Sequence, residues 1–119
     1  MYRIPKDLDL SKAVGEFTTQ IRVGQFDMQF DFGDVSFAVQ SPITLLDDGK
    51  VIAKWQEDSW PEEGFLRIFN VPISKIQVPD DRTIIIEFEN KVEMHLVDSS
   101  DQYESMQITI KGGTGVIVI

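Results

Sequence analysis

Hydrophobic and polar residues alternate from Phe26 to Phe32 and again from Val35 to Gln40. A period of two residues predicts β-strands with one buried and one solvated face. Between the two runs, Gly33-Asp34 suits a two-residue type II′ turn, whose first position favours glycine. Such a turn gives five cross-strand pairs, three apolar and two polar: Phe32 with Val35, Phe30 with Phe37, Met28 with Val39, Asp31 with Ser36, and Asp27 with Gln40. Since loop length and hydrophobic parity agree, we predict a hairpin over residues 26–40 in this register.

The same test predicts a second hairpin over residues 84–97. Its two apolar faces are Ile84, Ile86 and Phe88 on one strand and Val92, Met94 and Leu96 on the other. A two-residue loop would set Phe88 opposite Glu93, whereas a three-residue loop sets it opposite Val92. We therefore predict the longer loop, which commonly ends in a left-handed residue. Lys91 would hold that position, where glycine would be less strained.

The remaining apolar runs predict further strands and two short helices. The strands are expected at 21–23, 43–46, 51–55, 76–78, 106–110 and 116–119, with the pair flanking Asp47-Asp48-Gly49-Lys50 forming a third hairpin. We expect Pro79 to end the strand before it, and the wholly apolar last run to be a paired strand, covered on at least one side.

Helical spacing predicts one helix over residues 10–17, and Ser59 with Glu62 reads as a capping box that opens a second. Apolar side chains follow that box: Phe65, Leu66 and Phe69. The predicted fold is therefore mainly β. It consists of antiparallel sheets built from hairpins, as a sandwich or half-barrel, with one or two short helices in a single domain over residues 1–119.

Charge and composition narrow the classes of function. The 119 residues include 20 acidic and 11 basic side chains, for a net charge of -9. This balance disfavours binding to nucleic acid or acidic membranes, which begins with neutralisation of phosphates by Lys and Arg. It favours cations and basic proteins. No apolar run approaches the roughly 18 residues of a membrane span and the N-terminus lacks a signal-peptide core, so we expect a cytoplasmic protein.

Catalytic residue types are sparse in this chain. It contains no cysteine and one histidine, His95, and none of its serines lies in a Gly-x-Ser-x-Gly motif. The second hairpin's register sets Glu87 opposite Glu93 and Ile85 opposite His95. These two carboxylates and the imidazole could ligate a divalent metal, or act as a carboxylate pair with a base. Either role would make the protein a small metal-dependent enzyme or a metal-binding module. The alternative is a solvated face of an acidic protein, and we expect no enzyme, metal site or cofactor.

Two loops have the composition of a ligand site without its pattern. Residues 98–104 are rich in Asp and Ser but lack the alternating ligands and central glycine of an EF-hand, so we predict a turn. Residues 111–115 are rich in glycine, but the lysine precedes the glycines and a β-run follows. We predict a hairpin turn in place of a phosphate loop.

The segment from Trp55 to Glu63 is the candidate protein-binding site. In this segment, acidic side chains lie between and just after two tryptophans. The proposed site residues are Trp60, Glu57, Asp58, Glu62 and Glu63. A second contact is proposed at Glu87, Glu89 and Glu93. Tryptophan is enriched at binding hot spots, and carboxylates around it complement a basic partner. The alternative is that both indoles cap the core. Of the two, we expect Trp60 to be the more exposed.

The chain resembles a family of small, uncharacterised bacterial proteins of about this length, from Leu10 to its end. The resemblance lies in short motifs: Val14-Gly15, Gln20-Ile21-Arg22-Val23-Gly24, Phe26-x-Met28-x-Phe30, Ile86-Glu87-Phe88-Glu89-Asn90 and Tyr103-Glu104-Ser105. The family commonly has glycine where Lys91 stands and tryptophan where Met106 stands. The family carries no established activity. Some small acidic β-rich bacterial proteins of this general kind look like immunity proteins, and the link to this chain is one of analogy.

These observations favour a non-catalytic acidic binding protein. Its concrete form would be a bacterial immunity protein that neutralises a cationic toxin, with a basic protein as partner. Two alternatives stay open: a housekeeping domain whose ligand leaves no trace in the sequence, and the small metal-dependent enzyme that uses Glu87, Glu93 and His95.

Overall fold

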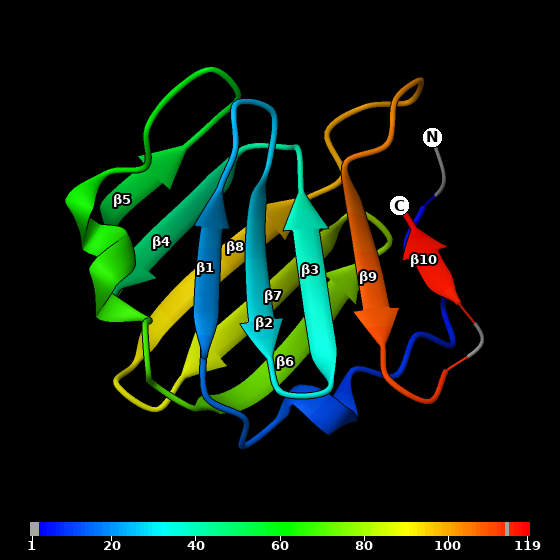
Figure 1. The fold of residues 1–119 in the computed structure, drawn as a ribbon, viewed down its shortest axis with the longest axis horizontal. Helices are drawn as coiled ribbons and strands as arrows, with labels where there is room; N and C mark the ends of the chain where they lie inside the picture. Colours follow the sequence, from blue (N-terminus) through cyan, green and yellow to red (C-terminus); the bar gives the residue numbers. More distant parts are fainter. Residues whose placement is uncertain (1–2, 114) are drawn as a thin grey trace.

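Two antiparallel sheets pack face to face in the computed structural model, which describes residues 3–113 and 115–119 (Figure 1). The first sheet has the strand order β1-β2-β3-β9-β10, with the bounds β1 Gln20–Val23, β2 Met28–Phe32, β3 Val35–Val39, β9 Met106–Ile110 and β10 Val116–Val118. The second has the order β5-β4-β8-β7-β6, with the bounds β4 Ile43–Asp47, β5 Lys50–Trp55, β6 Ile73–Asp80, β7 Thr83–Phe88 and β8 Val92–Val97. The prediction of a mainly β fold is confirmed, in the form of a sandwich.

The core lies between the sheets, where alternate residues of the central strands are buried. Phe32 of β2 and Phe88 of β7 meet across the interface with ring centroids 6.1 Å apart. Phe37 of β3 packs edge-on against Phe32 at 5.8 Å. Such aromatic pairs add about 0.5–1.5 kcal/mol each beyond the burial of their area. Period-two patterning thus places the large side chains on the two facing surfaces.

The first predicted hairpin forms in the expected register. Phe30 lies opposite Phe37 and Asp31 opposite Ser36, and the turn has Gly33 at φ 62°, as a type II′ turn requires. An added Cβ at Gly33 would collide with the carboxylate of Glu16. The hairpin is shorter than predicted, because the pairing between Asp27 and Gln40 is absent.

Both ends of that missing pair have other partners. Asp27 belongs to the β1–β2 turn, where its carbonyl accepts from the N–H of Gly24 at 2.8 Å. The N–H of Gln40 donates to the carbonyl of Ser105. Phe26, expected on the buried face, is therefore more than half exposed. Phe26 and Asp27, the first residues of the alternating run, therefore belong to the β1–β2 turn and not to a strand.

The second hairpin also forms as predicted. Ile86 lies opposite Met94, and Glu87 opposite Glu93. The three-residue loop closes with a hydrogen bond from the N–H of Lys91 to the carbonyl of Phe88 at 2.9 Å. Lys91 adopts φ 72°, the left-handed conformation that the parity argument required.

The other strands are found close to their predicted places, with one correction. The third hairpin, β4–β5, carries a bulge between Leu45 and Leu46. β6 runs to Asp80, so Pro79 does not end it. Proline is tolerated there because β6 is an edge strand and its pairing with β7 is irregular between Gln77 and Asp80. β10 pairs with β9, as expected, and leads to the buried Ile119. Thr114, in the predicted 111–115 turn, lies outside the described residues.

The helices differ most from prediction. The expected helix over 10–17 is a single 3-10 turn, η1 Ser11–Ala13, because Gly15 has φ 86° and its N–H donates to Ile73. The second is a short 3-10 helix, η2 Glu63–Arg67, without a capping box. The hydroxyl of Ser59 bonds to Gln56, and the Glu62 carboxylate accepts from the N–H of Lys54 at 2.7 Å.

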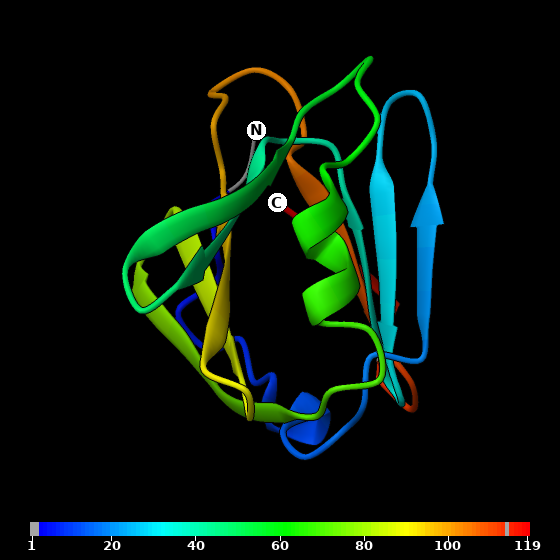
Figure 2. The same cartoon turned by 90° about the vertical axis from the view of Figure 1, so that its left-hand side faces the viewer.

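η2 fills the side of the sandwich between β5 and β1, as the turned view shows (Figure 2). Gly64 allows this close approach, since a Cβ there would lie 2.6 Å from the carbonyl oxygen of Ile52 on β5. Phe65 points into the core and is 4% exposed, whereas Leu66 and Phe69 are 72% and 52% exposed. So short a helix buries only one side, which leaves Leu66 in solvent, and Phe69 lies beyond the end of η2.

Candidate functional site

The two tryptophans of the candidate segment have opposite environments. Trp55, the last residue of β5, is 2% exposed, and its indole N–H donates to the carbonyl of Ser59 at 3.0 Å. The hydroxyl of Ser59 donates to the carbonyl of Gln56 at 2.6 Å and accepts from the N–H of Gln56 at 3.2 Å. The next residue, Trp60, is 79% exposed. The prediction that Trp60 is the more exposed indole is confirmed, and Trp55 caps the core.

An apolar groove of about 600 Å³ runs between β1 and η2, and we call it the β1–η2 groove. It is lined by Ile21, Val23, Met28, Trp60, Pro61, Glu62, Glu63, Phe65, Leu66 and Phe69. The two glutamates are exposed and lie at its rim. Apolar walls with a few charged groups at the edge are typical of binding sites.

Backbone hydrogen bonds close both ends of the β1–η2 groove. At one end, the N–H of Asn70 donates to the carbonyl of Thr18 at 2.8 Å, and the N–H of Thr18 donates to Val71 at 3.3 Å. At the other end, the N–H of Asp58 donates to the carbonyl of Gln25 at 2.8 Å. The chain between Asp58 and Asn70 therefore leaves the sheet edge and returns to it. The groove is the space between that excursion and β1.

Trp60 borders two smaller hollows besides the groove. One, of about 340 Å³, also includes Thr44 and Lys54, which lie on the outer face of the second sheet. The other, of about 360 Å³, includes Gly24 and Asp58. The indole therefore stands where three depressions meet. A partner that covered it would contact both the groove and the outer face of the second sheet.

The four acidic residues near Trp60 divide between two places. Glu62 and Glu63 line the groove, and Asp58 lies beside Trp60 with its carboxylate accepting from the side-chain amide of Gln25 at 2.9 Å. Glu57 lines a different pocket. Three of the four predicted carboxylates are thus brought together around the indole.

The second predicted set lies on and beside the outer face of the second sheet. Glu87 and Glu93 are direct neighbours there, and Glu89 is exposed in the β7–β8 turn. Lys75 lies opposite Glu87 on β6, and the imidazole Nε2 of His95 lies 2.9 Å from the Glu93 carboxylate. This face is therefore mixed in charge, because cationic or titratable groups accompany the carboxylates.

The two sets are connected across the second sheet. Lys54 lies beside Thr44, and Thr44 beside His95, in the register of β5, β4 and β8. Strands lie about 4.8 Å apart, so this row spans about 10 Å from the hollow at Trp60 to the strand that carries Glu93. Among the described residues, no three His, Asp or Glu side chains come together as metal ligands.

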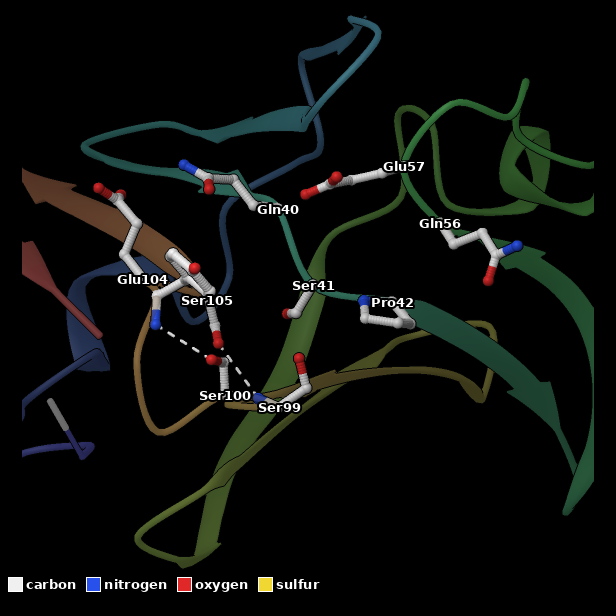
Figure 3. A pocket seen from close by; sticks show the side chains of 10 residues that line it. Gln40, Ser41, Pro42, Gln56, Glu57, Ser99, Ser100, Glu104 and Ser105 are labelled. Carbon is white, nitrogen blue, oxygen red and sulfur yellow. Dashed lines mark hydrogen bonds between the residues drawn. The ribbon is translucent and has the colours of Figure 1, made fainter. Parts of the chain in front are cut away.

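A polar pocket of about 550 Å³ lies at the end of the sandwich near the β8–β9 loop (Figure 3). Its lining is rich in hydroxyl and amide groups: Gln40, Ser41, Pro42, Gln56, Glu57, Ser99, Ser100, Tyr103, Glu104 and Ser105. The Ser105 hydroxyl donates to the buried Asp98 carboxylate at 3.0 Å, and Arg3 pairs with the same carboxylate at 2.9 Å. The sequence pattern predicted only a turn here.

Outside the groove, an ion pair clamps β1 to β2. The guanidinium of Arg22 donates to both carboxylate oxygens of Asp31, at 2.8 and 3.0 Å. These bonds, together with one from the hydroxyl of Ser36, lower the pKa of Asp31 below its ordinary value. Bidentate pairs of this kind are geometrically specific. The strand that forms one wall of the groove is thus fixed from its solvent side.

Sequence reasoning missed the apolar half of the site. The sequence pattern assigns Ile21 to a strand and Leu66 and Phe69 to a helix, and it does not predict that they line a common groove. The one available signal was the run Phe65-Leu66 with Phe69, because a short helix at a domain surface cannot bury all three.

Fold and site together define an antiparallel β-sandwich with an acidic-rimmed apolar groove beside an edge strand. A scan of protein-family models finds none that matches the chain, and searches of curated proteins and of solved structures find no significant match. The suspected family resemblance therefore stays a prediction. In the part of the chain that the structure describes, no helix is long and apolar enough to cross a membrane.

Proposed function

We propose that this protein is a non-catalytic binding protein for a basic protein partner. The observation that carries the proposal is the exposed Trp60, at 79%, beside the β1–η2 groove and its acidic rim. Tryptophan at the centre of an interface supplies a large apolar contact area. Carboxylates around it favour a cationic partner and disfavour an anionic one.

The exposed apolar side chains support the same proposal. Trp60, Leu66 and Phe69 all border the groove and are each more than half exposed. Isolated exposed apolar residues need no explanation, but a contiguous group rimmed by polar residues marks an interaction surface. The net charge of -9 keeps copies of the chain apart while leaving this surface open.

The concrete form that we propose is a bacterial immunity protein that neutralises a cationic toxin in the cytoplasm. An acidic inhibitor gains rapid association with a basic toxin through electrostatic steering. It inhibits by covering the toxin's cationic surface, for which its own fold needs no catalytic group. The sparse set of catalytic residue types in the sequence agrees with such a role.

A stable interface needs about 800 Å² from each partner, more than the loop around Trp60 provides. The remaining contact is assigned to the outer face of the second sheet, reached from Trp60 through Lys54 and Thr44. Glu87, Glu89 and Glu93 would form the far side of this interface. Lys75 and Lys54 limit how acidic the surface is, so the partner should carry some acidic side chains of its own.

The proposal is tested with the protein encoded immediately upstream of this chain's gene. Its C-terminal domain is expressed in a bacterial host, alone and together with this protein. The expected result is growth arrest by the domain alone, rescue on co-expression, and a one-to-one complex by size-exclusion chromatography with light scattering. A domain that is harmless, or that forms no complex, would overturn the immunity proposal.

A further inference from the structure

We propose that the partner binds the β1–η2 groove as an extended segment that adds a strand to the free edge of β1. The segment would carry apolar residues that enter the groove and Lys or Arg residues that meet Glu62 and Glu63. This inference rests on the proposed function, whose binding site it specifies. It assigns a backbone role to Ile21 and Val23, which the preceding proposal does not use.

The edge of the first sheet is unpaired over a short, defined stretch. Antiparallel pairs alternate between hydrogen-bonded and non-hydrogen-bonded positions. The N–H of Gly24 donates to the carbonyl of Asp27, so Gly24 is a hydrogen-bonded position at the end of the β1–β2 ladder. Alternation then makes Arg22 hydrogen-bonded to β2, and leaves Ile21 and Val23 without bonds to β2. The N–H and C=O groups of Ile21 and Val23 therefore point away from β2, along the free edge.

The chain itself pairs with this edge on both sides of the gap. The backbone of Thr18 bonds to the 70–71 segment, and the carbonyl of Gln25 bonds to Asp58. Among the described backbone bonds outside the strand ladders, none goes to Ile21 or Val23. The segment that would have continued the sheet forms η2 instead. One strand position is left open beside β1, which is an edge strand of its sheet.

The side chains around the gap fit an extended guest. Ile21 and Val23 point to the same side as the buried Met28 and Phe30, with which they are paired. A strand added beside them would place alternate side chains on that side, between β1 and the exposed Leu66. At about 3.4 Å per residue, the four residues of β1 accept about four residues of guest. Added strands gain affinity from main-chain bonds and specificity from alternate side chains.

Charge decides against a second copy of this chain as the guest. Each copy has a net charge of -9, and each carries Glu62 and Glu63 at the rim of its own groove. Bringing two such rims together places like charges side by side. A segment in which apolar residues alternate with Lys or Arg satisfies both the apolar walls and the acidic rim.

The experiment uses a phage-displayed library of random twelve-residue peptides, selected on the whole protein and counter-selected on its Leu66→Glu variant. Enriched peptides should alternate apolar residues with Lys or Arg. Binding is then measured by fluorescence anisotropy against two variants, Val23→Pro and Val23→Ala. Proline removes the N–H that points along the free edge and also fixes φ at about −65°, whereas alanine keeps the N–H. Circular dichroism and urea unfolding establish that both variants are folded.

We expect Val23→Pro to weaken the selected peptides at least tenfold relative to Val23→Ala. N-methylation of the alternate peptide nitrogens that face β1 should weaken binding by at least the same factor. N-methylation of the nitrogens that face away from β1 should not weaken it. Equal affinity for the two variants, insensitivity to N-methylation, or the absence of any enriched peptide would overturn strand addition.

The same variants separate this inference from the proposed function. If the toxin domain binds the wild type and Val23→Pro equally, and Trp60→Ala weakens it, the immunity proposal stands and strand addition is wrong. If no toxin domain binds but selected peptides lose affinity on Val23→Pro, the edge site stands and the immunity proposal is wrong.

Discussion

The buried indole of Trp55 donates a 3.0 Å hydrogen bond to the backbone carbonyl of Ser59, the residue that precedes the exposed Trp60. One tryptophan thus anchors the loop, and the other is presented by it. The bond fixes the loop's backbone, because a buried indole N–H without an acceptor would cost about 1–3 kcal/mol. The exposed indole is therefore held on a defined backbone, which lowers the entropy lost when a partner binds.

Replacement of Trp60 with alanine should separate binding from folding. Its side chain is mostly exposed, so we expect the free energy of unfolding to change by less than about 0.5 kcal/mol. Loss of a hot-spot tryptophan should weaken the partner complex by about 2 kcal/mol or more. Urea unfolding and isothermal titration calorimetry measure the two quantities.

Trp55→Ala is the matched control for that variant. Removing a buried tryptophan should lower the free energy of unfolding by about 3–5 kcal/mol. If Trp60→Ala lost stability on that scale and kept its partner affinity, Trp60 would be a structural residue and not a contact.

Salt should act mainly on the association rate of the complex. The rim carboxylate of Glu63 is exposed, and screening at 0.1 M salt acts beyond about 10 Å. We expect Glu63→Gln to slow association and to reduce its dependence on salt, with little effect on dissociation. Asp34→Asn, in the β2–β3 turn, makes the same charge change away from the groove and should have a smaller effect. Surface plasmon resonance over a salt series distinguishes them, and equal effects would contradict a site at η2.

Lys91→Gly should stabilise the fold. Lys91 has φ 72°, a conformation that costs a non-glycine residue about 1–2 kcal/mol. Glycine removes this strain but raises the entropy of the unfolded chain, so we expect a net gain of about 0.5–1 kcal/mol. Lys91→Ala keeps the strain and should be close to wild type in urea unfolding. A destabilised glycine variant would show that the lysine side chain contributes more than its backbone costs.

Acid should weaken the β1–β2 clamp. Because Arg22 lowers the pKa of Asp31 in the folded state, ionised Asp31 stabilises the fold above its ordinary pKa near 3.8. That contribution is lost as the pH falls through the lowered pKa. Asp31→Asn lacks it at every pH, so its difference in unfolding free energy from wild type should be largest near neutral pH and shrink below about pH 4. A difference that does not vary with pH would contradict this assignment.

Specific divalent metal binding is not expected. Glu87 and Glu93 are direct neighbours, but His95 bonds to Glu93, and Lys75 lies opposite Glu87. Titration calorimetry with zinc and with manganese should show no stoichiometric binding at micromolar affinity. Such binding, abolished by His95→Ala, would revive the small metal-dependent enzyme as the function.

The hairpins could be predicted because their determinants are local. Phe30 and Phe37 pair as expected, since a two-residue turn and a period of two leave one register that buries both. The left-handed Lys91 followed from the same parity argument. The predicted capping box at Ser59 is wrong, because the Ser59 hydroxyl donates to the backbone carbonyl of Gln56 and does not cap a helix.

The sequence by itself determined most of the strands, the pairing within the predicted hairpins, the acidic balance and the candidate tryptophan. Only the tertiary structure decided that Trp55 is buried, that Leu66 is exposed, and that the edge of β1 is open between Thr18 and Gln25. The groove depends on where the 58–70 segment leaves and rejoins a sheet edge more than thirty residues away in the chain. Periodicity reports which side of a strand is apolar, but it carries no information about which distant segment covers that side.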